Sequence, residues 1–217
     1  MTVSAQAGRV VAREQVGNRV LWSVPVPSNR TVHTAIRDHT VLIVTAQNRP
    51  WDATAATYDL RSGKRWWTQA LGGLFTRLYV KNDTFFIEYI STGGESRTNT
   101  IIQREKASRP LAEVPGRMLT QNANALLFSY EGPVNPYEAV TLNYFRYNLE
   151  KHQLVPLNYR VPQRPNCGEL QKDTTKVTDR VTNQYVYAMR SDLCGTFVAR
   201  FDWTKPADTP PVIEQIP

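Results

Sequence analysis

Hydrophobic positions along the chain alternate over short stretches, and polar turn residues separate these stretches at regular intervals. The clearest example is residues 57–67. A strand-like run ends at Leu60, Gly63 lies in a polar turn, and Trp66 and Trp67 begin the second strand of the hairpin. Alternation with a period of two, bounded by Gly, Asn and Asp, is typical of β-hairpins. No apolar run approaches the roughly 20 residues that a membrane-spanning helix needs.

Two kinds of hairpin alternate along the chain. Five hairpins of the first kind, here called outer, lie at residues 10–23, 57–67, 100–116, 145–161 and 198–213. Four of the second kind, here called inner, lie at residues 32–46, 75–90, 118–130 and 177–189. One inner and one outer hairpin together give four strands in a period of roughly 45 residues, which is typical of a β-propeller blade.

This repeat predicts the fold class. We expect an all-β chain that forms a small or partial β-propeller of about four to five blades, each a four-stranded antiparallel sheet. We expect a single domain over residues 1–217, with irregular ends at residues 1–8 and 204–217. An ordinary antiparallel sandwich with similar hairpins is the alternative.

One copy of the repeat carries a more specific motif. Asp59, Ser62, Gly63, Lys64 and Trp67 follow the pattern Asp-x-x-Ser/Thr-Gly-Lys-x-x-Trp, which resembles the tryptophan-docking repeat of PQQ-like β-propellers. In that family the glycine makes the hairpin turn and the tryptophan packs between adjacent blades. The other copies are degenerate, and residues such as Lys106, His152 and Lys205 stand where the glycine would be.

The resemblance implies a scaffold and not an enzyme. The family contains quinoprotein dehydrogenases and non-catalytic envelope scaffolds such as the BamB-like proteins. The dehydrogenases have a larger, eight-bladed ring with a quinone site, calcium ligands and a vicinal disulfide, whereas Cys167 and Cys194 are far apart in this sequence. The resemblance therefore implies the non-catalytic branch, without a cofactor.

The net charge of +7 is unevenly distributed. Residues 1–110 hold 15 Lys and Arg against 8 Asp and Glu, whereas residues 111–217 hold 11 of each kind. This asymmetry favours an acidic partner, and the alternative is a solvated surface that is rich in arginine. Nucleic-acid binding is the weaker interpretation, because it needs arginines gathered on one face beside stacking aromatic residues.

Loops on a rigid β frame are where binding residues gather. Six residues of the segment 47–65 are candidates for binding a partner: Arg49, Trp51, Asp52, Arg61, Lys64 and Arg65. Trp51 beside Arg49 either forms an exposed anchor of the kind that dominates interfaces or folds back onto a sheet. The loops at residues 91–99 and 160–172 are further candidates.

Catalytic motifs are missing from the sequence, which has no HExxH, no phosphate-binding loop, no GxSxG and no dinucleotide fingerprint. Glycoside hydrolysis would need a pair of carboxylates. Glu131 with Glu138, and Glu88 with Glu95, flank loops, but few strand positions are acidic. We therefore predict no catalytic residue and no metal site, and keep a carbohydrate-binding or glycan-active propeller as the alternative function.

The two cysteines bear on the cellular location. Cys167 and Cys194 lie in no CxxC motif and have no clustered histidines, so they indicate one disulfide or else two separate thiols. A disulfide persists only in an oxidising compartment. Residues 1–4 lack a signal-peptide pattern, so the chain is either cytosolic or has lost an export signal or membrane anchor.

The disulfide favours the exported alternative and a periplasmic, cell-envelope or extracellular location. The predicted function is a non-catalytic binding or scaffold module of a bacterial envelope or exported protein, which contacts a protein partner through its loops.

Overall fold

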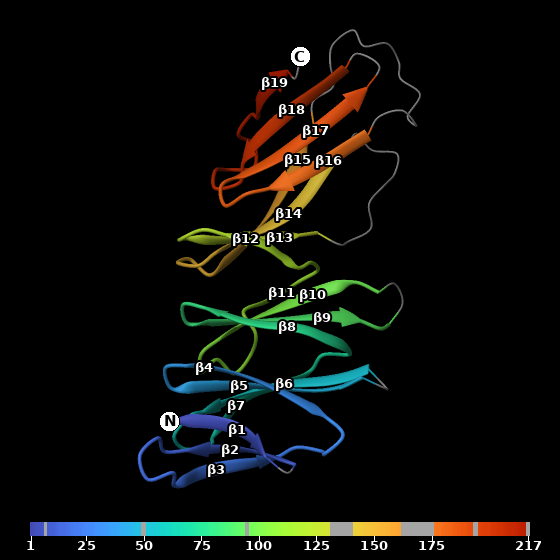
Figure 1. Cartoon of the computed structure of the whole chain (residues 1–217). Coiled ribbons are helices and arrows are strands. Elements are labelled where there is room, and N and C mark those ends of the chain that lie inside the picture. The colour runs from blue at the N-terminus through green and yellow to red at the C-terminus, as the bar shows by residue number, and fades with distance from the viewer. Residues whose placement is uncertain are drawn as a thin grey trace. The chain divides into compact units, whose positions relative to one another are not determined.

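The computed structural model describes residues 1–6, 8–48, 51–93, 96–130, 141–161, 176–192 and 195–215. Within these residues all regular elements are β-strands in antiparallel sheets, which confirms the all-β prediction (Figure 1). No helix among them is long and apolar enough to cross a membrane. The chain divides into two compact units, Met1–Gly116 and Arg117–Pro217, and each is described by itself. The single domain stays a prediction.

The first unit contains one three-stranded and two four-stranded sheets. The first sheet consists of β1 (Thr2–Gln6), β2 (Arg9–Arg13) and β3 (Val20–Pro25). The second consists of β4 (Thr31–Arg37), β5 (Thr40–Asn48), β6 (Trp51–Asp59) and β7 (Arg65–Ala70). The third consists of β8 (Gly73–Lys81), β9 (Thr84–Ser91), β10 (Thr98–Arg104) and β11 (Ala112–Val114). In each sheet, spatial neighbours are also neighbours in the sequence.

The second unit contains two four-stranded sheets with the same simple strand order. One consists of β12 (Met118–Gln121), β13 (Ala125–Ser129), β14 (Thr141–Asn148) and β15 (Gln153–Arg160). The other consists of β16 (Lys176–Val181), β17 (Tyr185–Asp192), β18 (Gly195–Asp202) and β19 (Val212–Gln215).

The predicted hairpins are confirmed. The inner hairpins are β4–β5, β8–β9, β12–β13 and β16–β17, and the outer ones are β2–β3, β6–β7, β10–β11, β14–β15 and β18–β19. Each four-stranded sheet is one inner hairpin followed by the next outer hairpin. The ends expected to be irregular instead carry β1, which pairs with β2 from Thr2 to Gln6, and β19, which pairs with β18. Backbone pairing to a neighbouring strand orders both segments, and the predicted outer hairpin at residues 198–213 already included the first two residues of β19.

Two of the three outer turns in which another residue stands in place of glycine keep the positive φ, whereas Lys205 does not. Gly63 has a φ of 71°, and Lys106 and His152, at the equivalent place in two other outer hairpins, have φ values of 55° and 50°. A non-glycine residue held in this region costs of order 1–3 kcal/mol, so the surrounding structure must stabilise it. The His152 ring contributes through its Nδ1 atom, which lies 3.0 Å from the Tyr147 hydroxyl.

The core of the first unit forms between successive sheets. Ile43 of β5 packs with Val10 of β2, whereas Leu42 and Val44 of β5 pack with Phe85 of β9. Successive side chains of a strand point to opposite faces, so the continuous apolar run in β5 serves two interfaces. The β4–β7 sheet is therefore buried on both faces along this strand.

The tryptophan contacts in the first unit come from two hairpins. Trp67 is 6% exposed and lies in the core between the β4–β7 and β8–β11 sheets. Trp22 of β3 reaches the β6–β7 turn, where its Nε1 donates to the Leu60 carbonyl at 2.9 Å and its ring stacks on Tyr58. A Cβ atom at Gly63 would lie 2.6 Å from Trp22 Cγ. Gly63 is thus required both for its positive φ and for the close approach of Trp22.

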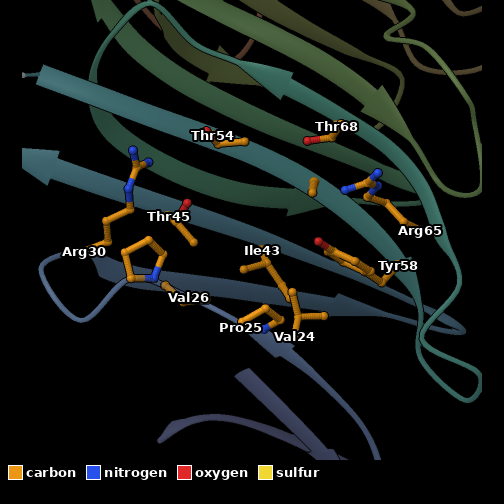
Figure 2. Close-up of a pocket in the computed structure, with 12 residues that line it drawn as sticks. Val24, Pro25, Val26, Arg30, Ile43, Thr45, Thr54, Tyr58, Arg65 and Thr68 are labelled. Carbon is orange, nitrogen blue, oxygen red and sulfur yellow. The ribbon is translucent and has the colours of Figure 1, made fainter. Parts of the chain in front are cut away.

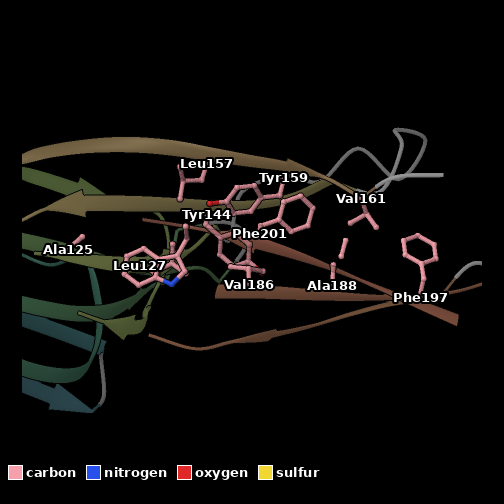
Figure 3. Packing of buried hydrophobic residues seen from close by; sticks show 12 residues of the cluster. Ala125, Leu127, Tyr144, Leu157, Tyr159, Val161, Val186, Ala188, Phe197 and Phe201 are labelled. Atoms are coloured by element: carbon pink, nitrogen blue, oxygen red, sulfur yellow. The ribbon is translucent and has the colours of Figure 1, made fainter. Parts of the chain in front are cut away.

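The core of the second unit lies between its two sheets (Figure 3). The rings of Tyr159 and Phe201 stack with their centroids 4.6 Å apart. The Tyr144 hydroxyl donates a hydrogen bond of 2.5 Å to Asp179, which joins β14 to β16. Burial, and then the neighbouring carboxylate, raise the pKa of Tyr144 well above its ordinary value, so this phenol stays protonated.

Candidate binding site

A hollow of about 440 Å³ lies between the β1–β3 sheet and one face of the β4–β7 sheet (Figure 2). Its floor is apolar and includes Val24 of β3, Val26 immediately after β3, and Ile43 and Ala56 from the second sheet. The volume falls in the range of roughly 300–1,000 Å³ that is typical of ligand pockets. The hollow is therefore large enough to accept side chains of a partner.

The rim of this hollow is polar. Two arginines and three threonines contribute to it: Arg30, Thr45, Thr54, Arg65 and Thr68. Figure 2 shows Arg30 and Arg65 at opposite ends, with Thr45 and Thr54 between them. An apolar floor with a few polar groups at the rim is typical of a binding site.

A β-bulge brings Arg65 into the hollow. The pairing of β6 with β7 shifts from Thr57 opposite Trp67 to Tyr58 opposite Arg65, which leaves Trp66 as the extra residue. Because side chains alternate along a strand, Arg65 then shares the face of Tyr58, whereas Trp67 points to the other face and enters the core. The bulge lets one strand supply both a core tryptophan and a rim cation.

The two arginines differ in their ionic partners. Arg30 Nη2 donates to Asp52 Oδ2, and the Arg30 and Asp52 side chains are 17% and 42% exposed. Arg65 is exposed and pairs with no carboxylate among the described residues. One end of the hollow is therefore close to neutral, and the Arg65 end carries an uncompensated positive charge.

The other basic candidates lie on the β6–β7 turn. Arg61 and Lys64 are exposed there, and Lys64 Nζ lies 4.7 Å from the centroid of the Trp66 ring. We refer to Arg61, Lys64 and Arg65 as the basic turn. It lies next to the hollow and shares Arg65 with it.

Asp59 fixes the backbone of the basic turn. Its Oδ1 accepts hydrogen bonds from the backbone N–H of Arg61 at 3.0 Å and of Ser62 at 2.7 Å, and from the Ser62 hydroxyl at 2.9 Å. The hydrogen bond from the Ser62 backbone N–H is the main cause of the lowered pKa of Asp59, so the Asp59 carboxylate stays ionised. Asp59 is a turn-stabilising group, and its oxygen is already engaged.

The structure does not bring Trp51 to the hollow. Trp51 is 55% exposed and lies on the same face of β6 as Ala53 and Ala55, which pack toward the β8–β11 sheet. Asp52, on the opposite face, is the partner of Arg30. Arg49 lies outside the described residues.

Several other predicted groups also lie outside the described residues, namely Cys167, Cys194, Glu95, Glu131 and Glu138. The disulfide and the loop carboxylate pairs therefore stay predictions. Glu88 is described and is buried at 6% exposure. No group of three or more His, Cys, Asp or Glu among the described residues could hold a metal ion.

A second hollow, of about 690 Å³, lies between β4 and β8. His33 and Phe75 line it and their ring centroids lie 4.6 Å apart, and the Arg77 guanidinium lies over the Tyr79 ring, 5.3 Å from its centroid. Its cation is thus already engaged with an aromatic ring. Arg65 contacts neither a carboxylate nor an aromatic ring among the described residues, so the hollow that it lines is the better candidate for binding a charged partner.

No known protein family matches the chain, and no curated protein matches it. The resemblance to PQQ-like propellers at residues 57–67 therefore stays a prediction.

Proposed function

We propose that the chain is a non-catalytic binding module that engages a protein partner with an acidic surface. The observation that carries the proposal is the basic turn. Its cations Arg61, Lys64 and Arg65 are exposed, lie within five consecutive positions, and pair with no carboxylate among the described residues. Clustered, unpaired cations raise the local positive potential and speed association with an acidic surface.

The rigidity of the basic turn supports the same proposal. Asp59 bonds its backbone, and Trp22 holds it from the neighbouring sheet through the Leu60 carbonyl. A rigid turn loses little conformational entropy when a partner binds, so more of the interaction energy appears as affinity.

We also propose that the sheets are blades of a propeller of the non-catalytic, PQQ-like kind, without a cofactor. Two observations support this: the alternation of inner and outer hairpins, and the docking of Trp22 beside Gly63. A location in the periplasm, the envelope or outside the cell follows if Cys167 and Cys194 form a disulfide.

Affinity capture with charge variants tests the proposed function. The immobilised chain is exposed to envelope and soluble fractions of its source and eluted with salt. The test variant is R61Q/K64Q/R65Q. The control, K151Q/R160Q/R180Q, removes the same charge from three exposed cations of the second unit.

We expect a protein that the native chain and the control variant retain, that moderate salt releases, and that the basic-turn variant loses. A protein retained equally by all three chains would refute the role of the basic turn.

Carbohydrate binding is a second candidate, favoured by an aromatic group in the second unit. Tyr185 and Tyr187 of β17 are partly exposed, with their rings edge to face at 6.0 Å, and the Arg200 guanidinium lies 4.9 Å over Tyr185. A glycan array tests it. Glycan binding that disappears in Tyr187→Ala would favour this function, and a blank array would exclude it for the sugars present.

A further inference from the structure

We propose that the hollow between Arg30 and Arg65 binds an extended peptide segment in which an apolar residue and a carboxylate lie two positions apart. This inference rests on the proposed binding of an acidic protein partner, and it names the feature of that partner that the site would recognise.

The floor of the hollow selects an apolar side chain. Val26 and Ala56 are buried, and Val24 and Ile43 complete the apolar surface beneath the opening. Water over such a floor makes few hydrogen bonds, so an apolar side chain that displaces it is favoured. A purely ionic ligand would leave this surface unused.

The Arg65 end selects a carboxylate. A guanidinium presents its N–H donors in a planar fork that matches the two oxygens of a carboxylate. Arg65 has no competing acid among the described residues, and Thr68 lies on the same face of β7, where its hydroxyl adds a donor. The carboxylate of the ligand would therefore face Arg65.

The Arg30 end limits the ligand to one acid at this site. Asp52 already accepts from Arg30, so a second carboxylate placed there would approach Asp52 as well. Like charges in proximity repel, which disfavours an unbroken acidic run in the hollow. The site is thus polarised, with a neutral end and a cationic end.

The spacing of the strands indicates an extended peptide. Neighbouring strands lie about 4.8 Å apart, and Arg65 on β7 is offset from Ile43 on β5 by two residues along the strands, so their Cα atoms are separated by roughly 12 Å. In an extended peptide, side chains at positions i and i+2 share a face and lie roughly 7 Å apart. The long side chain of Arg65 and the carboxylate side chain of the peptide together span the difference between these two distances. The hydroxyls of Thr45 and Thr54 lie between the two ends, where they can bond the peptide backbone.

Titration of the ¹⁵N-labelled chain with short peptides tests the inference. The probe is acetyl-Gly-Leu-Ser-Glu-Gly-amide, and its two matched controls carry Gln for the Glu or Ser for the Leu. We expect the probe to shift the amide signals of Thr54, Tyr58 and Thr68, and each control to bind more weakly.

Three variants sharpen this test. Arg65→Gln should weaken binding of the probe about fivefold, the value for loss of one exposed ion pair. Thr54→Tyr should abolish binding, because it fills the hollow without changing its charge. Arg180→Gln, in the second unit, should leave binding unchanged. The far-ultraviolet circular dichroism of each variant establishes that it is folded.

A fourth variant tests the neutral end. Asp52→Asn removes the acid that occupies Arg30 while keeping the side-chain shape. A peptide with a second Glu, acetyl-Glu-Ser-Leu-Ser-Glu-amide, should then bind about fivefold more tightly to this variant than to the native chain. Equal affinity for the two chains would overturn the assigned polarity of the site.

The outcomes separate this inference from the proposed function. Equal binding of the probe to the native chain and to Thr54→Tyr would overturn the hollow as the site. The proposed function would still stand if a captured protein depended on the basic turn. If neither the probe nor any captured protein responds to R61Q/K64Q/R65Q, both proposals fail.

Discussion

Gly63→Ala is the substitution that most sharply tests how the β1–β3 sheet docks on the β6–β7 turn. An alanine at a φ of 71° costs about 1–2 kcal/mol. Its Cβ would also meet Trp22 Cγ at 2.6 Å and Trp22 Cβ at 2.9 Å, so the indole must move. Loss of the Nε1 bond to Leu60 adds about 0.5–1.5 kcal/mol, and loss of the stack on Tyr58 adds about 0.5–1.5 kcal/mol. The total is about 2–5 kcal/mol.

A matched control separates the two causes. Gly17 also has a positive φ, of 79°, but a Cβ there would meet nothing within 4 Å. Gly17→Ala should therefore cost only the backbone contribution of about 1–2 kcal/mol. Urea unfolding, followed by circular dichroism and by tryptophan fluorescence, measures both free energies. Equal costs for the two substitutions would refute the docking of Trp22 on the turn.

A double-mutant cycle completes this test. In a Trp22→Ala background the indole is gone, so Gly63→Ala should cost no more than Gly17→Ala does in the native chain. A cost that is unchanged by the loss of Trp22 would place the strain elsewhere in the turn.

Three further substitutions have defined outcomes. Trp67→Ala should lower the free energy of unfolding by about 3–5 kcal/mol, because it empties a site between two sheets, and a loss below about 1 kcal/mol would contradict that packing. Asp59→Ala should cost about 1–2 kcal/mol through the lost turn bonds, measured by urea unfolding, and a neutral effect would show that the turn forms without them. Tyr144 has a folded-state pKa raised above the ordinary 10.0, so stability should fall as the pH rises above that value. Urea midpoints measured across this range should fall less steeply in Tyr144→Phe, and identical slopes would contradict the assignment.

The hairpins were predictable because their signals are local. Short runs of strand-forming residues such as Phe85–Ile87, and turn residues such as Asn82 and Gly63, specify a hairpin within about 15 residues. Strand β1 was not predicted because Thr2–Gln6 alternates over only five residues with Val3 as its one large apolar side chain, and it becomes a strand by pairing with β2.

The candidate site was predictable only in part. The motif drew attention to Arg65, but Arg30 lies on the connection between β3 and β4 and has no motif around it. The two meet at one hollow only because the β1–β3 sheet packs on the β4–β7 sheet. The bulge at Trp66 orients the side chain of Arg65 toward the hollow. This bulge depends on the pairing between β6 and β7 and has no recognisable sequence motif.

The docking of Trp22 on the β6–β7 turn also depends on packing between two sheets and not on a local sequence pattern. Trp22 and Leu60 are joined by a hydrogen bond across 38 positions of sequence, a separation at which local patterns carry no information. The repeat did contain a clue, since Trp22 occupies in its own hairpin the place that Trp67 occupies in the next. Comparison of equivalent repeat positions, and not of neighbouring residues, would have found it.

The role of the basic turn is tested most directly by the dissociation constant of the captured protein, measured with purified components at low and at physiological salt. We predict that binding weakens as salt rises and that R61Q/K64Q/R65Q weakens it about tenfold at low salt, since three exposed charges that each contribute about 0.5 kcal/mol sum to about 1.5 kcal/mol. The control K151Q/R160Q/R180Q should bind like the native chain. Equal affinity of all three chains, with no dependence on salt, would contradict the proposed mode of binding.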